Sequence, residues 1–502
     1  MKRFFSKIGR FFWSWGFLKL VLGLFALVVL LYIEEDWRGA HAWALTKAKW
    51  EAKGETFDYS KFIPPPVPDE QNLAAIPLLE IKQESSQSSD FPEPYLGMPN
   101  LEKAMHKGES TIEFPIGGPE KVREMLAKDY EIAFHGQKPP PAALAQFDAL
   151  YPFTADLRAA AAKRPVFRLN LDYTASPPAV RSLGPVTKAI TLAKVLTEHA
   201  LLALDDKQPD LALRDIKVNY IVLSGVKRDP SLVGGLVAIG IAAISNTALD
   251  DGLTRHSWND AQLAELQQVL KPINFLADFQ FGMRCEITNS TATLEFMKHT
   301  NRSGLDQAFG PGASTAPISA LINVPWPSGW WDQNESQMAT YFFQSLESVD
   351  PQARLVFPKG ERYLQNQIEQ ARTGWRAFAP GSIIANVAVG PIVSATQQYA
   401  RAQVSVDERR IGCALERFRL AHGVYPEKLE ELAPACIDEL PHDIMNGEPY
   451  HYRVNADGTF LLYSVRWNQV DDGGKVVFKN EAKTQIDYEQ GDWVWPTPKA
   501  AK

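Results

Sequence analysis

The chain has 502 residues, of which 45% are hydrophobic and 22% charged, and its formal net charge is −7. It is too long for one compact core, so the sequence predicts a folded protein of several units. An acidic chain is repelled by phosphate backbones, and we therefore expect no nucleic acid among its partners.

Residues 11–33 form an apolar run in which Lys19 is the one charged residue. As a helix rising about 1.5 Å per residue, the run is about 34 Å long, enough to cross the hydrocarbon core of a lipid bilayer. Basic residues precede the run and acidic residues follow it. The positive-inside rule then predicts an inner (cytoplasmic) membrane protein with its N-terminus in the cytoplasm and its body in the periplasm. We expect an uncleaved signal anchor, and the alternative is a signal peptide cleaved near Ala40-His41-Ala42.

The region after the apolar run changes from helical to irregular. Residues 34–56 contain good helix formers and no proline, which predicts a helical stalk that ends near Gly54. A stiff proline-rich spacer follows at residues 63–68. Residues 69–180 are predicted to cover the next domain as an irregular layer. Short helices are expected there at residues 118–129 and 142–163.

From residue 185 to about 402, the apolar residues recur at helical spacing. A short break separates segments 187–204 and 209–224, which predicts an antiparallel αα-hairpin. Residues 231–249 are almost wholly apolar, but their glycines and flanking charges favour a helix buried among other helices over a second membrane span. Further helices are expected at residues 259–269, 272–297, 334–347 and 351–377.

A Gly- and Pro-rich segment within this region, residues 301–333, carries an aromatic cluster of Trp326, Trp330 and Trp331. If exposed, these rings could stack on the sugars of a cell-wall glycan, which makes them candidate glycan-binding residues. We favour the commoner role, in which tryptophans pin a loop against the body.

The C-terminal unit has a clear local pattern. Ser405 and Glu408 fit a capping box, and the apolar residues that follow occupy one helix face, so a helix is predicted from Ser405 to Gly423. A short helix is expected at residues 426–432. The remaining prediction is a small antiparallel sheet packed on the long helix, with strands at residues 450–454, 459–465, 475–478 and 492–495.

Four strings occur in this unit in order: GVYPEKLEEL, LPHDIMNGEPYHYRV, DGTFLLYSV and NQVDDGG. Together they resemble the globular domain of the major pseudopilins of type II secretion systems, over about residues 400–478. The chain departs from that family after Gly16-Phe17, where Val21 stands in place of the family's glutamate. The resemblance therefore implies a shared module in an envelope protein, without membership of the filament.

The same resemblance implies a calcium site in the loop that follows the Tyr-Ser strand. Asn468, Asp471 and Asp472 occupy this loop, and oxygen ligands on a flexible loop suit calcium. The alternative is a solvated turn, because Asp-Asp-Gly-Gly is also ordinary turn chemistry.

Little else in the sequence indicates chemistry. It contains no phosphate-binding glycine loop, nucleophile elbow or zinc motif, so nothing indicates an enzyme. Glu295 and His299 form an i, i+4 pair that could hold a metal or bond to each other. Cys413 and Cys436 could pair in an oxidising compartment, although we favour three buried thiols, the third being Cys285.

The predicted fold class is mainly α, with one transmembrane helix, an αα-hairpin ectodomain and a small α+β C-terminal domain with an antiparallel sheet. The predicted units are a cytoplasmic tail (1–10), a transmembrane helix (11–33), a helical stalk (34–60), a proline-rich linker and cover region (61–180), a helical domain (181–402) and a pseudopilin-like domain (403–502). The predicted function is binding of other envelope proteins, linked to secretion or envelope assembly. The alternative is a protein that binds cell-wall glycan or an enzyme that acts on the cell wall.

Overall fold

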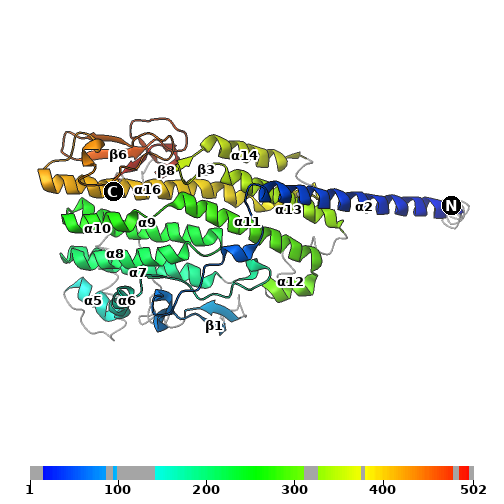
Figure 1. Ribbon diagram of the computed structural model, residues 1–502, viewed down its shortest axis with the longest axis horizontal. Helices are drawn as coiled ribbons and strands as arrows, with labels where there is room; N and C mark the ends of the chain where they lie inside the picture. Colours follow the sequence, from blue (N-terminus) through cyan, green and yellow to red (C-terminus); the bar gives the residue numbers. More distant parts are fainter. Residues whose placement is uncertain are drawn as a thin grey trace, which may run out of the picture.

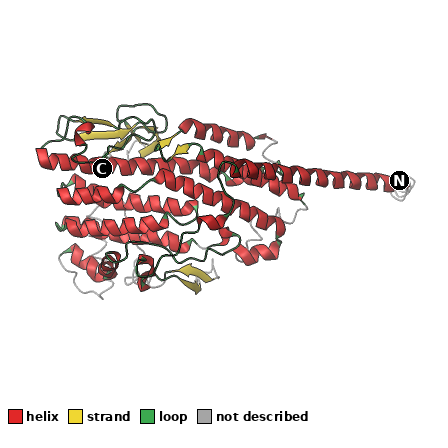
Figure 2. Cartoon of the chain, viewed as in Figure 1, coloured by secondary structure: helices red, strands yellow, loops and turns green. Residues whose placement is uncertain are grey.

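The computed structural model describes residues 15–85, 94–98, 142–181, 183–309, 326–374, 379–478 and 486–496. These residues form an elongated body of packed helices, and one long helix projects from an end of the body (Figure 1). Strands are few and gather mostly beside the C-terminal part of the chain (Figure 2). The predicted mainly α fold is therefore confirmed, and the C-terminal strands form small antiparallel sheets in place of the single sheet that the sequence predicts.

The projecting helix is α2, Trp15–Glu51, which has 37 residues. Its apolar half is exposed, and its polar half packs on α13, Ser328–Leu346. The helix predicted after residue 33 is confirmed, because α2 continues without a break past that residue and ends shortly before Gly54. It packs on α13, whereas the sequence predicted a stalk. A long, apolar and unburied N-terminal helix fits a single membrane anchor or a signal sequence.

Three consecutive helices pack against one another in the body. They are α7, Gly184–Asp205; α8, Pro209–Val226; and α9, Leu232–Thr254. The first two form the predicted αα-hairpin. Of the helices that the structure describes, α2 and α9 are apolar and long enough to cross a membrane, but most of the apolar segment of α9 is buried. The prediction of a buried helix at residues 231–249 is therefore confirmed.

Three further helices extend this body. They are α10, Asp260–Leu270; α11, Phe275–His299; and α16, Gly390–His422. Asn259 and Gln262 form a capping box at the start of α10, where the sequence predicted a helix start. Because α11 packs against α9, α13 and α16, it lies inside the helical body.

Shorter elements surround the long helices. They are α5, Ala143–Leu150; α6, Phe153–Ala161; α12, Arg302–Phe309; α14, Pro358–Ala371; α15, Ile383–Ala388; and the paired strands β1, Lys82–Ser85, and β2, Pro94–Gly97. The single helix predicted over residues 142–163 is wrong, because Pro152 has no N–H to continue the hydrogen bonding and divides the segment into α5 and α6. The helix predicted at residues 118–129 lies outside the described residues.

Helix α16 corrects the predicted start of the C-terminal unit. Ser405 lies in the middle of this 33-residue helix, so it caps no helix end. Its hydroxyl instead accepts a hydrogen bond of 2.6 Å from Arg409 Nη1, one turn later. The boundary predicted between residues 402 and 403 falls inside the same helix. Helix α16 ends where the sequence predicts, at Gly423, which has the left-handed conformation with a φ of 80°.

The C-terminal strands form two small antiparallel sheets. β5, His451–Val454, β6, Phe460–Ser464, and β9, Trp493–Trp495, pair in the order β5-β6-β9, while β7, Val476–Phe478, pairs with β8, Ile486–Gly491. The predicted hairpin of β5 and β6 is confirmed. Another two-stranded sheet, of β3 (Val349–Asp350) and β4 (Leu355–Val356), lies before α14. The short helix predicted at residues 426–432 is a single 3₁₀ turn at Leu429–Leu432.

Candidate functional site

The polar half of α2 is held on α13 by direct backbone contact. A Cβ added at Gly39 would lie 2.1 Å from the carbonyl oxygen of Gly329, so these two glycines allow the helices to touch. Nearby, Glu35 is only 8% exposed, and its Oε2 accepts hydrogen bonds from Trp330 Nε1 at 2.9 Å and Gln333 Nε2 at 3.0 Å. The exposed apolar half of α2 therefore leads directly into a fixed contact with the body.

This contact continues along the rest of α2. Thr46 Oγ1 lies 2.6 Å from Ser336 Oγ, and the rings of Trp50 and Phe343 stack with their centroids 4.3 Å apart. Trp50 is buried. Because contacts run from Glu35 to Trp50 within one unbroken helix, we find no hinge between the apolar half of α2 and the part packed on α13.

The predicted glycan-binding tryptophans lie at this contact. Trp331 is 5% exposed, and Trp330 is half-buried with its indole N–H donated to Glu35. Trp326 is also half-buried and meets the Trp330 ring edge-on, with their centroids 5.4 Å apart. The three side chains thus gather where α13 begins and meets α2. Trp331 offers no exposed ring for stacking on a sugar, and glycan binding by the other two stays a prediction.

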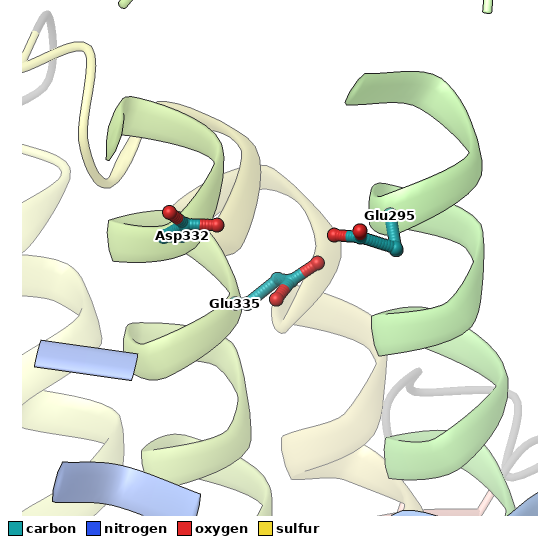
Figure 3. Close-up of side chains that lie close together, drawn as sticks. All are labelled: Glu295, Asp332 and Glu335. Atoms are coloured by element: carbon teal, nitrogen blue, oxygen red, sulfur yellow. The ribbon is translucent and has the colours of Figure 1, made fainter. Parts of the chain in front are cut away.

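Three carboxylates come together between α11 and α13 (Figure 3). Glu295 projects from α11, and Asp332 and Glu335 lie one turn apart on α13. One oxygen from each of the three side chains lies within 4.8 Å of the others. Asp332 is 5% exposed and Glu335 1% exposed, whereas Glu295 is exposed, so the cluster opens to solvent on the side of Glu295.

Two basic side chains of α11 border the cluster. Lys298 Nζ donates to Asp332 Oδ1 at 2.6 Å and lies 3.8 Å from Glu295 Oε2. His299 Nε2 lies 3.0 Å from Glu295 Oε1. The sequence predicts that Glu295 and His299 either hold a metal or bond to each other. The contact between the two side chains is confirmed.

Glu335 differs from its neighbours because its Oε1 is buried and has no hydrogen-bond partner. In Figure 3 its side chain points from α13 toward Glu295. Burial, together with the charges of Glu295 and Asp332, raises the pKa of Glu335 to about 8, and the charge of Lys298 opposes this rise. Glu335 is thus a buried acid whose ionised form the surrounding side chains stabilise poorly.

The predicted calcium ligands lie elsewhere, on the loop between β6 and β7. Asn468, Asp471 and Asp472 are all exposed. Asp471 Oδ1 accepts hydrogen bonds from the Tyr463 hydroxyl at 3.0 Å and from the backbone N–H of Gly473 at 2.8 Å. Among the described residues, three side chains of Asp, Glu, His or Cys converge at Glu295, Asp332 and Glu335. The carboxylates of the loop form no such group. Calcium binding by the loop stays a prediction.

The cysteines offer no reactive site. Cys285, Cys413 and Cys436 are buried free thiols, as the favoured prediction has it. Burial raises the pKa of all three thiols, which disfavours the nucleophilic thiolate.

Comparison with known proteins adds no function to this geometry. No family model, no curated protein and no solved structure matches the chain. The resemblance to major pseudopilins therefore rests on the sequence strings of the C-terminal unit and stays a prediction.

Sequence reasoning singled out Glu295 but missed Asp332 and Glu335. The available signal was their i, i+3 spacing, which places two acidic residues on one face of a helix. That signal was hidden because the helix was predicted to begin at residue 334, whereas α13 begins at Ser328.

Proposed function

We propose that this chain is a single-pass protein of the inner (cytoplasmic) membrane whose body lies on the periplasmic side and binds other envelope proteins. The observation that carries the proposal is α2 itself. Its apolar half is exposed, and its polar half is clamped on α13 without an intervening hinge.

The chemistry of α2 supports insertion into a bilayer. Large apolar side chains are exposed from Leu18 to Ile33, and hydrocarbon solvates them far better than water does, by about 25 cal/mol for each Å². Trp37 is 67% exposed just beyond this stretch, at the depth where indole rings favour the membrane interface. The basic residues that precede the run, Lys2, Arg3, Lys7 and Arg10, support the orientation with the body outside.

The fixed contact with α13 gives the body a defined orientation toward the membrane. In Figure 1, α2 leaves one end of the body, and β6 with the adjoining end of α16 lies toward the opposite end. The pseudopilin-like unit would therefore face away from the bilayer, where partners in the envelope can reach it.

A groove at that distal end is our proposed protein-binding surface. It has a volume of about 380 Å³ and combines apolar and charged side chains, with Glu416, Tyr425, Phe460 and Trp495 among its lining residues. Val424, which precedes Tyr425 in the chain, is 64% exposed. Exposed apolar side chains beside a charged groove are typical of surfaces that bind protein segments.

Photo-crosslinking in the native cells tests this proposal. A photoreactive residue at Val424 is expected to give covalent adducts with envelope proteins. The matched control is Tyr363, an apolar side chain on α14 that is 65% exposed and lies outside the groove. Adducts at neither position, or equal adducts at both, would contradict the groove as a binding surface.

Protease protection tests the orientation separately. Protease added outside spheroplasts is expected to digest the body and to spare the N-terminal tail. A body that is digested only after the membrane is permeabilised would show that the proposed orientation is wrong.

A further inference from the structure

The contacts of the carboxylate cluster of Glu295, Asp332 and Glu335 compensate the ionised form of Glu335 least: His299 contacts Glu295, and Lys298 serves the other two carboxylates. Lys298 pairs with Asp332 and, more distantly, with Glu295. The Oε1 atom of Glu335 receives no hydrogen bond, although the residue is only 1% exposed. Leaving an ionised carboxylate buried and unpaired costs several kcal/mol, so Glu335 favours either a proton or a cation that takes the proton's place.

We propose that Glu295, Asp332 and Glu335 bind a divalent metal ion that prefers oxygen ligands, of the Mg²⁺ or Mn²⁺ type. This proposal is independent of the function proposed above, because it depends only on side chains of α11 and α13. It assigns a binding role to a cluster that lies between α13, which contacts α2, and α11, which lies inside the helical body.

The spacing of the oxygens suits such an ion. Oxygens bound to one ion at about 2.1 Å lie at most about 4.2 Å from each other. The three carboxylates already offer oxygens within 4.8 Å, so small side-chain rotations are enough to bring all three onto one ion. Asp332 and Glu335 project from the same face of one helix, which limits how far they need to move.

The environment favours an ion that keeps part of its water shell. Glu335 points into the cluster from the buried side, and Glu295 forms the exposed side (Figure 3). Water can therefore fill the coordination positions that the protein leaves open. Mg²⁺ and Mn²⁺ favour octahedral coordination by oxygen, and Mg²⁺ commonly retains several waters alongside one or two carboxylates.

Lys298 is the competitor for the same negative charge. Its Nζ lies 2.6 Å from Asp332 Oδ1, and a bound divalent ion would repel it. The Lys298 side chain is 16% exposed, so part of it already reaches solvent on the open side of the cluster. Removing this positive charge should therefore tighten ion binding.

Mn²⁺ binding to the full-length protein in detergent micelles, stripped of metal with a chelator and followed by EPR, tests the proposal. The wild type is expected to bind one Mn²⁺ per chain and to melt at a higher temperature when the ion is present. E335Q removes a carboxylate that the ion would need as a charged ligand, with little change of shape, and is expected to weaken Mn²⁺ binding by about ten-fold or more. K298M is expected to tighten binding by about ten-fold.

An exposed carboxylate outside both acidic groups provides the matched control. E369Q removes the exposed carboxylate of Glu369 on α14 and should bind Mn²⁺ as the wild type does. The double variant D471N and D472N reports separately whether the ion binds to the acidic loop instead. If E335Q does not fold, E295Q serves in its place, because Glu295 is exposed and its amide keeps the side chain's size.

Three results would overturn the proposal. The first is a wild type that binds no Mn²⁺ at millimolar concentration, which would leave a proton as the only ligand of Glu335. The second is E335Q or E295Q binding Mn²⁺ as tightly as the wild type. The third is loss of binding in the loop variant with both cluster variants unaffected, which would place the ion in the loop.

Discussion

The C-terminal unit and the α11–α13 contact each bury an acidic side chain, but the two side chains differ in the hydrogen bonds that they accept. In the C-terminal unit, buried Asp443 accepts hydrogen bonds from the backbone N–H groups of Met445 and Val465 and from the Ser464 hydroxyl. Between α11 and α13, Glu335 is equally buried, yet its Oε1 accepts none. The first carboxylate organises a fold, and the second is left open to a ligand.

The difference follows from the backbone around each carboxylate. Asp443 lies in a turn, where backbone N–H groups are not used by a helix and can be donated to a side chain. Glu335 lies inside α13, where the neighbouring backbone N–H groups already serve the helix. A carboxylate buried on a helix face therefore depends on side chains, a proton or an ion for compensation.

The strongest test of this comparison is D443A. The substitution removes the acceptor of three hydrogen bonds and leaves two backbone N–H groups buried without partners. We expect a loss of about 3 kcal/mol in the free energy of unfolding, measured by urea unfolding of the full-length protein in micelles.

D457A is the matched control for D443A. Asp457 also accepts hydrogen bonds, from the backbone N–H and the hydroxyl of Thr459, but it lies in the exposed β5–β6 turn. We expect a much smaller loss from this substitution. An equal loss in both variants would mean that burial of Asp443 is not what makes its hydrogen bonds matter.

Glu361 is an intermediate case, and E361Q gives the next largest effect. Its Oε2 accepts from the Ser348 hydroxyl at 3.1 Å and from the Ser345 hydroxyl at 3.4 Å, whereas its Oε1 has no partner. Burial raises the pKa of Glu361 from 4.5 to about 7, although hydroxyl groups around it act in the opposite direction. The folded protein therefore holds this proton to a higher pH than the unfolded chain does.

The sign of the pH effect follows from that difference. The contribution of Glu361 to stability is fully present below about pH 4.5 and is lost as the pH rises toward about 7. We expect E361Q to gain stability relative to the wild type between pH 5 and pH 8, by on the order of 2 kcal/mol. Urea unfolding at both pH values measures this gain. A difference between the two proteins that is the same at both pH values would contradict it.

Local sequence patterns correctly predict the helix ends and turns that depend on neighbouring residues. The break between α7 and α8, the glycine stop of α16 and the β5–β6 turn depend on residues close together in the chain. The same approach placed a helix start at Ser405, because a capping box is a local pattern. It was wrong there, since the preceding residues were already helical and left no N–H group to cap.

The carboxylate cluster could not be predicted in the same way. The start of α13 follows a Gly- and Pro-rich segment, and contact with α2 supports it: Asp36 Oδ1 accepts a hydrogen bond of 2.9 Å from the backbone N–H of Gly329. That partner lies 293 residues away in the sequence. The meeting of Glu295 with Glu335 likewise requires α11 and α13 to be neighbours, which no local pattern specifies.

The smallest expected effect is that of D471N in the loop after β6. Asp471 is exposed, and its hydrogen bonds from Tyr463 and Gly473 hold a turn in contact with water. Water can replace these bonds, so we expect the free energy of unfolding to change by less than about 0.5 kcal/mol without added metal. Melting with and without calcium completes the test. If calcium raises the melting temperature of the wild type and not of D471N, the loop binds an ion although Asp471 already accepts hydrogen bonds. A buried oxygen without a hydrogen bond would then not be what distinguishes ion sites in this protein.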